Sequence, residues 1–195
     1  TINTEINKVE NNLNIDYAMI NVNDYDETME QEIMSFDSVE MVGKANFLQK
    51  LVTIDGEHAF EIVFSCETEK TEHFMNFELP SDVVNEFKNP KKNYIVVTSE
   101  FLKANDMSVG DFLSFKIQDE YVSYQIIADC NVGFQLFAYT NDCYNTNVGC
   151  NSVLVSTNNT NDQSLKDFNV FIREKYSNNM VYILNVAEAI NNIFI

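Results

Sequence analysis

Positive charge is scarce in this sequence. Its 195 residues carry 12 basic and 30 acidic side chains, which gives a formal net charge of −18 at pH 7. Only one basic residue is an arginine, Arg173. A surface this acidic repels phosphate backbones and so argues against nucleic acid as a partner. Cationic partners are compatible with the charge, which also serves solubility by itself.

Long apolar runs are missing too. No stretch reaches the ~18 apolar residues that a membrane-spanning helix needs. No signal peptide with a basic start, an apolar stretch and a small-residue cleavage site is present. The chain starts at Thr1 and ends inside an apolar helical pattern, at Ile195. We therefore expect it to be a processed or excised piece of a longer protein.

The sequence motifs of common enzymes are absent as well. There is no Gly-x-x-x-x-Gly-Lys phosphate loop and no dinucleotide fingerprint, so this chain is not itself an ATPase. His58 and His73 are the only histidines, and neither has the spacing of a metal ligand pair. The acidic stretch "NDYDETMEQE" lacks the glycine of a calcium loop. The expectation is no catalytic, no cofactor-binding and no metal-ligating residue.

Four cysteines leave the redox state open. None of Cys66, Cys130, Cys143 and Cys150 has C-x-x-C spacing, which argues against a zinc knuckle or a thioredoxin-type site. Cys143 and Cys150 flank a short polar loop that a disulfide could close, while buried free thiols are an equal alternative. A cysteine–histidine nucleophile pair would need a partner such as His73, and is the weakest alternative.

The apolar content is sufficient for a packed interior. Hydrophobic residues make up 45% of the chain, including 15 Phe and 9 Tyr. This length suits one domain or two small lobes that share a core. Five aromatic residues could line a groove for a lipid or peptide, although core packing is the favoured interpretation: Phe74, Phe77, Phe134, Phe137 and Tyr139.

Periodicity predicts a helix at each end and a strand-rich middle. Apolar residues recur at helical spacing near both ends: Ile2, Ile6, Val9 and Leu13, then Ile183, Val186, Ala187, Ile190 and Ile193 or Phe194. Between them we expect a strand at 17–22, an acidic-faced helix at 25–36, a hairpin turning at Asp55-Gly56, and strands at 121–130 and 133–140. A further helix is predicted at 79–90, with Ser81 as its N-cap. A last helix is predicted at 165–176, after a polar loop that starts at Ser156.

The segment from Tyr94 to Ile117 predicts a strand, a short helix, a tight turn and a second strand. Thr98 or Ser99 is a suitable N-cap, and Phe101, Leu102 and Ala104 form the buried side of the helix. Gly110 supplies a positive φ, and Asp111 bonds back to nearby amides. Leu113, Phe115 and Ile117 then alternate along a strand that pairs with residues 121–128.

The order of these pieces resembles the extracytoplasmic core domain of FtsX/MacB-like ABC-transporter permeases. The positions that match that family's segment are Val96, Val97, Ser99, Ala104, Val109, Gly110 and Asp111. Ala104 is slightly displaced from the usual alanine, and Ala128-Asp129 replaces a glycine-containing strand end. The segment covers about a fifth of the chain. By this resemblance Ser99, Val109, Gly110 and Asp111 are the structural motif residues.

The resemblance implies an α+β fold. A mixed α/β lobe built from both chain ends would carry a smaller α/β lobe inserted in the middle. Residues 1–195 would form one extracellular core domain, with a membrane-proximal lobe at approximately 1–65 and 151–195 and an inserted lobe at approximately 66–150. The helices predicted at the two ends fit this layout.

The resemblance also implies a function. The domain would lie on the extracellular face of the cell membrane, flanked by transmembrane helices, and relay the motion driven by a separate ATP-binding cassette subunit. It would act without catalysis on a peptide, a lipoprotein or a cell-wall protein. Composition points weakly to a Gram-positive bacterium. The alternative is a secreted or surface-anchored ligand-binding module without a transporter, and a third is a small hydrolase that depends on His73.

Overall fold

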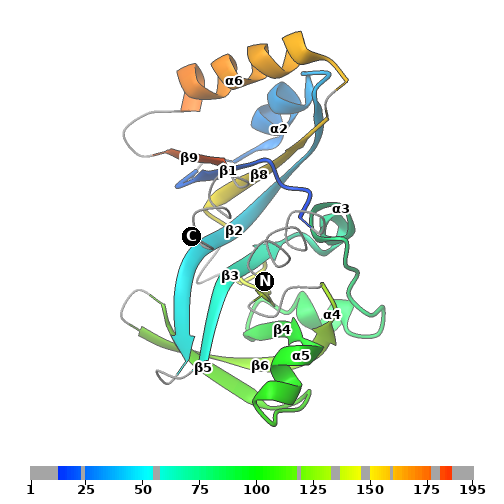
Figure 1. The fold of residues 1–195 in the computed structure, drawn as a ribbon, viewed down its shortest axis with the longest axis vertical. Coiled ribbons are helices and arrows are strands. Elements are labelled where there is room, and N and C mark those ends of the chain that lie inside the picture. Colours follow the sequence, from blue (N-terminus) through cyan, green and yellow to red (C-terminus); the bar gives the residue numbers. More distant parts are fainter. Residues whose placement is uncertain are drawn as a thin grey trace, which may run out of the picture.

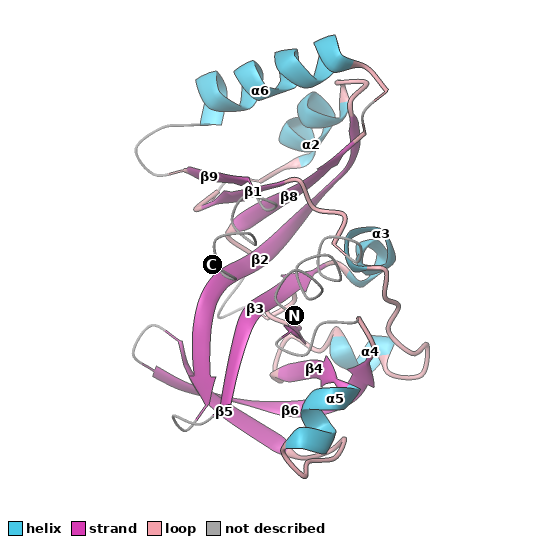
Figure 2. Cartoon of the chain, viewed as in Figure 1, coloured by secondary structure: helices cyan, strands magenta, loops and turns pink. Residues whose placement is uncertain are grey.

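A single nine-stranded mixed sheet forms the framework of the computed structural model (Figure 1). The structure describes residues 13–22, 25–54, 58–117, 120–132, 137–145, 150–158, 160–176 and 181–185. The strand order is β5-β6-β4-β7-β3-β2-β8-β1-β9. Helices lie against the sheet along its length (Figure 2). The predicted α+β class is confirmed.

The elements have the following bounds. The strands are β1 Tyr17–Ile20, β2 Val39–Ile54, β3 His58–Cys66, β4 Tyr94–Thr98, β5 Phe112–Ile117, β6 Glu120–Cys130, β7 Phe137–Thr140, β8 Ser152–Thr157 and β9 Tyr182–Asn185. The helices are α2 Glu27–Met34, η1 Thr68–Lys70, α3 Thr71–Met75, α4 Val84–Phe87, α5 Ser99–Ala104 and α6 Asp162–Tyr176, of which η1 is a 3₁₀ turn.

The two ends of the sheet come from different parts of the chain. Strands from both ends of the described chain, β1, β8 and β9, lie at one end of the sheet, and the mid-chain strands β4 to β7 lie toward the other. The 16-residue β2 joins them, because its first part pairs with β8 and its second part with β3. Figure 1 shows β2 bending as it passes between the two ends. The predicted boundaries near residues 65 and 151 stay a prediction.

Three apolar clusters follow one another along the sheet. The first packs α2 and α6 on β1, β2 and β8 through residues such as Ile33 and Phe168. The second lies under α3 and α4 and contains Phe74, Phe87 and Tyr139. The third lies under α5 and is centred on Phe60. At ~25 cal/mol per Å² of buried apolar surface, these clusters are the main favourable contribution to folding.

The β5–β6 hairpin shows the predicted alternation. Leu113 and Phe115 are buried, and the Phe115 ring stacks on Tyr124 with their centroids 4.9 Å apart. Phe112 points to the other face and is 63% exposed. The far end of β2 comes close to β5, so these strands curl around the third cluster. The curl gives α5 an apolar surface to cover.

The close approach of η1 and α3 to β2 depends on Gly43. A Cβ atom at this position would lie 2.9 Å from Lys70 Cδ and 3.1 Å from Phe74 Cε2. Lys70 also donates a 2.9 Å hydrogen bond to the Val42 carbonyl. A larger residue here would force Lys70 or Phe74 to shift, so glycine is the residue that suits this contact.

Several sequence predictions are wrong in their details. Residues 182–185 of the predicted C-terminal helix form β9, because tertiary pairing with β1 outweighs the helical spacing. Ser81 lies in a turn, and α4 starts at Val84 without a side-chain cap. Ala104 is exposed at the end of α5, whereas Phe101 and Leu102 are buried as predicted. The predicted N-terminal helix and the Asp55-Gly56 turn lie outside the described residues, except for Leu13.

Two further differences concern the segment before α6. The loop predicted to start at Ser156 begins later, because Ser156 and Thr157 belong to β8. The Thr157 amide donates a 2.7 Å hydrogen bond to Asp16, which extends the strand beyond its apolar run. The helix predicted from Leu165 starts at Asp162.

Gly43→Ala is expected to destabilise the protein by about 1 to 3 kcal/mol, because the new methyl group overpacks the contact with Lys70 and Phe74. Urea unfolding followed by circular dichroism measures the change. In a Lys70→Ala background the same substitution should cost less, since the nearest atom has been removed. Strictly additive effects of the two substitutions would contradict this account.

Candidate functional site

The predicted motif residues fasten α5 and its turn to β6. Thr98, not Ser99, is the N-cap of α5, and its hydroxyl accepts a 3.2 Å hydrogen bond from the Phe101 amide. The Ser99 hydroxyl donates to the Asp129 carboxylate and is 3.4 Å from the Cys130 carbonyl. Ser99 thus ties the start of the helix to the end of β6.

The turn before β5 has the predicted chemistry. Gly110 adopts a φ of +103°, and the Ser108 amide donates a 2.8 Å hydrogen bond to the Asp111 carboxylate. The Gly110 amide donates to the Ile126 carbonyl, and the Ile126 amide donates to the Asp111 carbonyl, both at 2.8 Å. Val109 is 52% exposed and contributes little to the core. Every one of these contacts is structural in kind.

An exposed aromatic surface lies beside this turn. Phe112 on β5 and Tyr121 on β6 are 63% and 71% exposed. Both residues lie on the hairpin face opposite the third cluster, as the pairing of Leu113 with Tyr124 requires. Exposed aromatic side chains are suited to contacts with another molecule.

A buried polar loop follows β7. The Asn141 side chain accepts a 2.8 Å hydrogen bond from the Tyr94 amide and donates to the carbonyls of Phe87 and Lys92, both at 2.9 Å. Asn145 donates a 2.6 Å hydrogen bond to the Asn93 side chain. The loop therefore holds α4, the segment before β4 and β4 itself together.

Asp142 in this loop is a buried carboxyl group. Its two oxygens accept 2.9 Å hydrogen bonds from the Tyr124 hydroxyl and the Thr140 hydroxyl. Burial raises the pKa of Asp142, and the two hydrogen bonds offset part of that rise. Burial also raises the pKa of Tyr124, with the neighbouring carboxylate acting in the same direction. Because both hydroxyls donate to it, the carboxyl orders the loop and does not serve as a free base.

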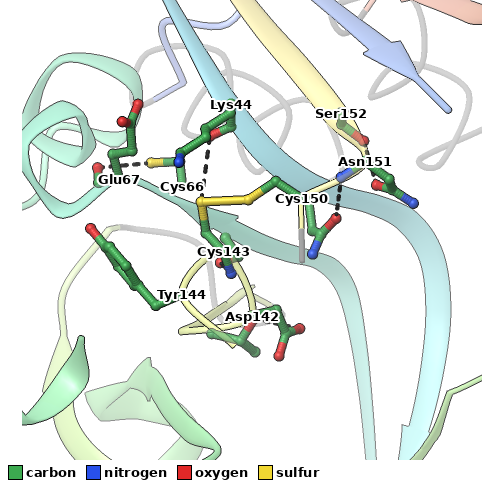
Figure 3. Close-up of a disulfide and its surroundings, with 12 residues drawn as sticks. Lys44, Cys66, Glu67, Asp142, Cys143, Tyr144, Cys150, Asn151 and Ser152 are labelled. Atoms are coloured by element: carbon green, nitrogen blue, oxygen red, sulfur yellow. Dashed lines mark hydrogen bonds between the residues drawn. A yellow bond between two sulfur atoms is a disulfide. The ribbon is translucent and has the colours of Figure 1, made fainter. Parts of the chain in front are cut away.

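Cys143 and Cys150 form a disulfide, with their Cα atoms 5.0 Å apart. Figure 3 shows the bond beside Lys44 of β2, whose carbonyl oxygen is 3.8 Å from Cys143 Sγ. The other two cysteines, Cys66 and Cys130, are free and buried. Burial raises the pKa of Cys66 well above its usual value and that of Cys130 to about 12. Neither thiol is therefore a ready nucleophile.

The His73 imidazole joins α3 to the first part of the sheet. Its Nε2 atom lies 2.6 Å from Ser156 Oγ, 3.0 Å from Asn14 Nδ2 and 3.8 Å from Glu40 Oε2. In a serine hydrolase the acid contacts the other ring nitrogen, whereas here all three groups meet the same one. Ser156 is also completely buried. This geometry matches a structural bridge. The hydrolase alternative needs a cysteine beside His73, and the groups that meet Nε2 are a serine, an asparagine and a glutamate.

The remaining candidates are resolved by packing and pairing. In the predicted aromatic groove, Phe74, Phe137 and Tyr139 are buried in the core, and the half-buried Phe77 packs against Tyr139. Phe134 lies outside the described residues. On the acidic helix α2, the Lys175 ammonium lowers the pKa of Glu32 through an ion pair. Within the described ranges, no group of three or more His, Cys, Asp or Glu side chains could hold a metal ion.

No helix in the described part of the chain is both long and apolar enough to cross a membrane.

Comparison with known proteins identifies solved structures only. No protein-family model and no curated protein matches this chain. The chain is similar to the periplasmic region of MacB from Actinobacillus actinomycetemcomitans, at 12% identity and a TM-score of 0.47, covering 98% of this chain and 96% of that one. It is similar to the extracellular domain of the noncanonic ABC-type transporter YknZ from Gram-positive bacteria, at 11% identity and 0.47, covering 87% and 99%.

A third similar structure is a domain of a permease protein from Porphyromonas gingivalis, at 8% identity and a TM-score of 0.43, covering 87% of this chain and 86% of that one. The chain resembles the extracytoplasmic domains of ABC-transporter permeases. At these identities and TM-scores, its function has to be inferred from its own contacts.

Sequence reasoning missed the loop formed by Asn141 and Asp142. The signal was present in "YTNDCY", where polar residues follow a strand and precede a cysteine. The Asn141 side chain is bound by positions about 50 residues away, Tyr94 and Phe87, and Asp142 is bound by Tyr124 on β6. The tie between Lys70 and β2 was missed for the same reason.

Gly110→Ala is expected to cost about 1 to 2 kcal/mol, because alanine is strained at a positive φ. No atom lies within 4 Å of the added Cβ, so the cost comes from the backbone and not from a clash. Urea unfolding measures it. Ser108→Ala in the same turn is the matched control and should stay within about 0.5 kcal/mol of the parent. A neutral Gly110→Ala would contradict the role assigned to the turn.

Asp142→Asn is expected to change the pH dependence of stability. Because the pKa of Asp142 is raised in the folded state, the native protein holds this proton longer than the unfolded chain, and stability falls as pH rises above the unfolded pKa of about 4. Asparagine does not titrate, so the Asp142→Asn variant lacks this loss of stability with rising pH. The variant should therefore gain stability relative to the parent between about pH 4 and neutrality, and not at more acidic pH.

Urea titrations at several pH values test this expectation. The difference between the two proteins isolates Asp142 from carboxylates whose pKa is lowered, such as Glu69. Thr140→Val removes one hydroxyl donor and should raise the pKa of Asp142 further, which extends the fall in stability to higher pH. A variant whose stability differs from the parent by the same amount at every pH would rule out this role.

Proposed function

We propose that this chain is the extracytoplasmic domain of an ABC-transporter permease, which acts by binding and relay and not by catalysis. The observation that carries the proposal is the pairing of β1 with β9. Tyr17 is in register with Asn185, and the two strands are antiparallel neighbours. The chain therefore enters and leaves the sheet side by side, an arrangement that suits a domain inserted between two consecutive membrane helices.

The sheet provides a route for movement. β1 and β9 lie at one end of it, and β2 runs without interruption from their neighbour β8 to the strands of the other end. A displacement at β1 and β9 would reach the exposed Phe112 and Tyr121 through this hydrogen-bonded framework. The first lobe, at approximately 1–65 and 151–195, would lie near the membrane, and the inserted lobe, at approximately 66–150, would meet the partner.

The disulfide supports a location outside the cytoplasm. Structural disulfides persist in oxidising compartments and are rare in the cytosol. The bond between Cys143 and Cys150 thus fits the extracellular face of the cell membrane. ATP hydrolysis would belong to a separate cassette subunit, reached through the membrane region, because this sequence has no phosphate loop.

The ligand class proposed is a peptide, lipoprotein or cell-wall protein. Exposed aromatic side chains at Phe112 and Tyr121 offer an apolar contact, and the net charge of −18 favours a cationic ligand. Binding to such a ligand should weaken as salt is raised.

The parent gene tests the proposal directly. Apolar runs of about 20 residues are expected on both sides of this segment, together with a neighbouring gene for an ATP-binding cassette subunit. A parent gene with a signal peptide or a single anchor and no later membrane span would instead establish the secreted or surface-anchored ligand-binding module.

The relay is tested in the assembled transporter. Spin labels on one exposed residue at each end of the sheet, Val170 on α6 and Lys103 on α5, report the distance between the ends and leave Phe112 and Tyr121 unchanged. Trapping the cassette subunit with ATP and vanadate should shift that distance, whereas a control pair within α6, Lys166 and Val170, should not change. Identical distances in all nucleotide states would exclude the relay.

A further inference from the structure

The disulfide connects strands that are not neighbours in the sheet. Cys143 follows β7 and Cys150 precedes β8, and β3 and β2 lie between these two strands. Strands three places apart in a sheet are separated by ~14 Å. The two Cα atoms are nevertheless 5.0 Å apart. The connection therefore passes over β3 and β2, where Cys143 Sγ contacts the Lys44 carbonyl (Figure 3).

The residues beside each cysteine are hydrogen-bonded to a different part of the sheet. On one side, the Cys143 amide donates a 2.8 Å hydrogen bond to Ser65 at the end of β3, and the Tyr144 hydroxyl accepts a 2.7 Å hydrogen bond from the Thr68 amide. The Asp142 side chain next to it holds β6 through Tyr124. This side belongs to the mid-chain strands.

The other side belongs to the strands from the chain ends. The Asn151 amide, next to Cys150, donates a 3.0 Å hydrogen bond to the Asn46 side chain on β2. The Asn151 carbonyl accepts a 2.8 Å hydrogen bond from the Val22 amide, just after β1. The disulfide thus joins two sets of contacts that are also connected through β2 and β3 and through the contact of His73 with Ser156.

We propose that the Cys143–Cys150 disulfide is a redox-sensitive strap between the two ends of the sheet, and that its reduction by a dithiol frees the loop of residues 141–145. Both cysteines are partly exposed, whereas the free Cys66 and Cys130 are buried. A thiolate of the dithiol attacks one sulfur atom to form a mixed disulfide. Its second thiol then displaces the protein sulfur, which leaves two protein thiols and one oxidised dithiol.

The effect of reduction is local. Neither Cys143 nor Cys150 belongs to the three apolar clusters, so the core packing is untouched. The sequence separation of the two cysteines is 7. Closing a loop this short reduces the number of conformations open to the chain by a factor on the order of tens. We expect the gain in mobility to appear in the loop and at its partner Thr68, and not across the whole chain.

Hydrogen exchange measured by mass spectrometry tests the strap on the oxidised protein with and without dithiothreitol. Exchange in peptides containing residues 142–145 and Thr68 should become at least about tenfold faster on reduction, while peptides of α6, which has no part in the loop, should not change. The double variant Cys143→Ser/Cys150→Ser should exchange as fast as the reduced protein, and dithiothreitol should not change its exchange rates. Cys66→Ala/Cys130→Ala is the matched control and should respond as the parent does.

Alkylation of the parent protein gives a second measurement that needs no variant. Under native conditions only Cys143 and Cys150 should be labelled, and only after mild reduction. Labelling without reductant would show that the strap is absent. Equal acceleration of exchange in every peptide would show that the bond stabilises the whole chain. No acceleration in any peptide would show that the bond does not restrain the loop. Either result overturns the proposal.

Discussion

Gly43 has no side chain, so Lys70 of η1 and Phe74 of α3 pack directly on the backbone of β2 at this position. This approach lets Lys70 reach the Val42 carbonyl and the carboxylates of Glu67 and Glu30, 2.9 and 3.5 Å away. It also places Phe74 in the middle cluster and His73 against Ser156. This contact therefore fixes η1 and α3 against β2, together with the bond from His73 to Ser156 on β8.

Buried hydrogen bonds from the loop after β7 also hold separate strands together. The loop after β7 uses Asn141 to hold the segment before β4, Asp142 to hold β6, and Cys143 to hold β3. Buried hydrogen bonds of this kind add little net stability, but an unpaired group in their place would be costly. The apolar clusters therefore supply the favourable energy of folding, and the polar loop selects one arrangement of the strands.

Much of the local structure could be predicted from the sequence, because it depends on near neighbours. The helix stripe of Met29 and Ile33, the positive φ of Gly110 and the alternation of Leu113 and Phe115 all follow from spacing or residue type. Long-range contacts were not predictable in this way. The close contact at Gly43 and the buried hydrogen bonds of Asn141 depend on residues far away in the sequence, and β9 forms a strand because it pairs with β1.

The double pairing of β2 has a consequence for how this protein can change over evolutionary time. Side chains on a strand alternate between faces, so one inserted or deleted residue reverses the faces of everything beyond it. In β2 such a change would disturb the pairing with β8, with β3, or with both. Irregularities at Val39–Met41 and Gln49–Val52 already lie near its two ends. Length variation among descendants of this chain should therefore collect at those two places and leave 42–48 constant in length.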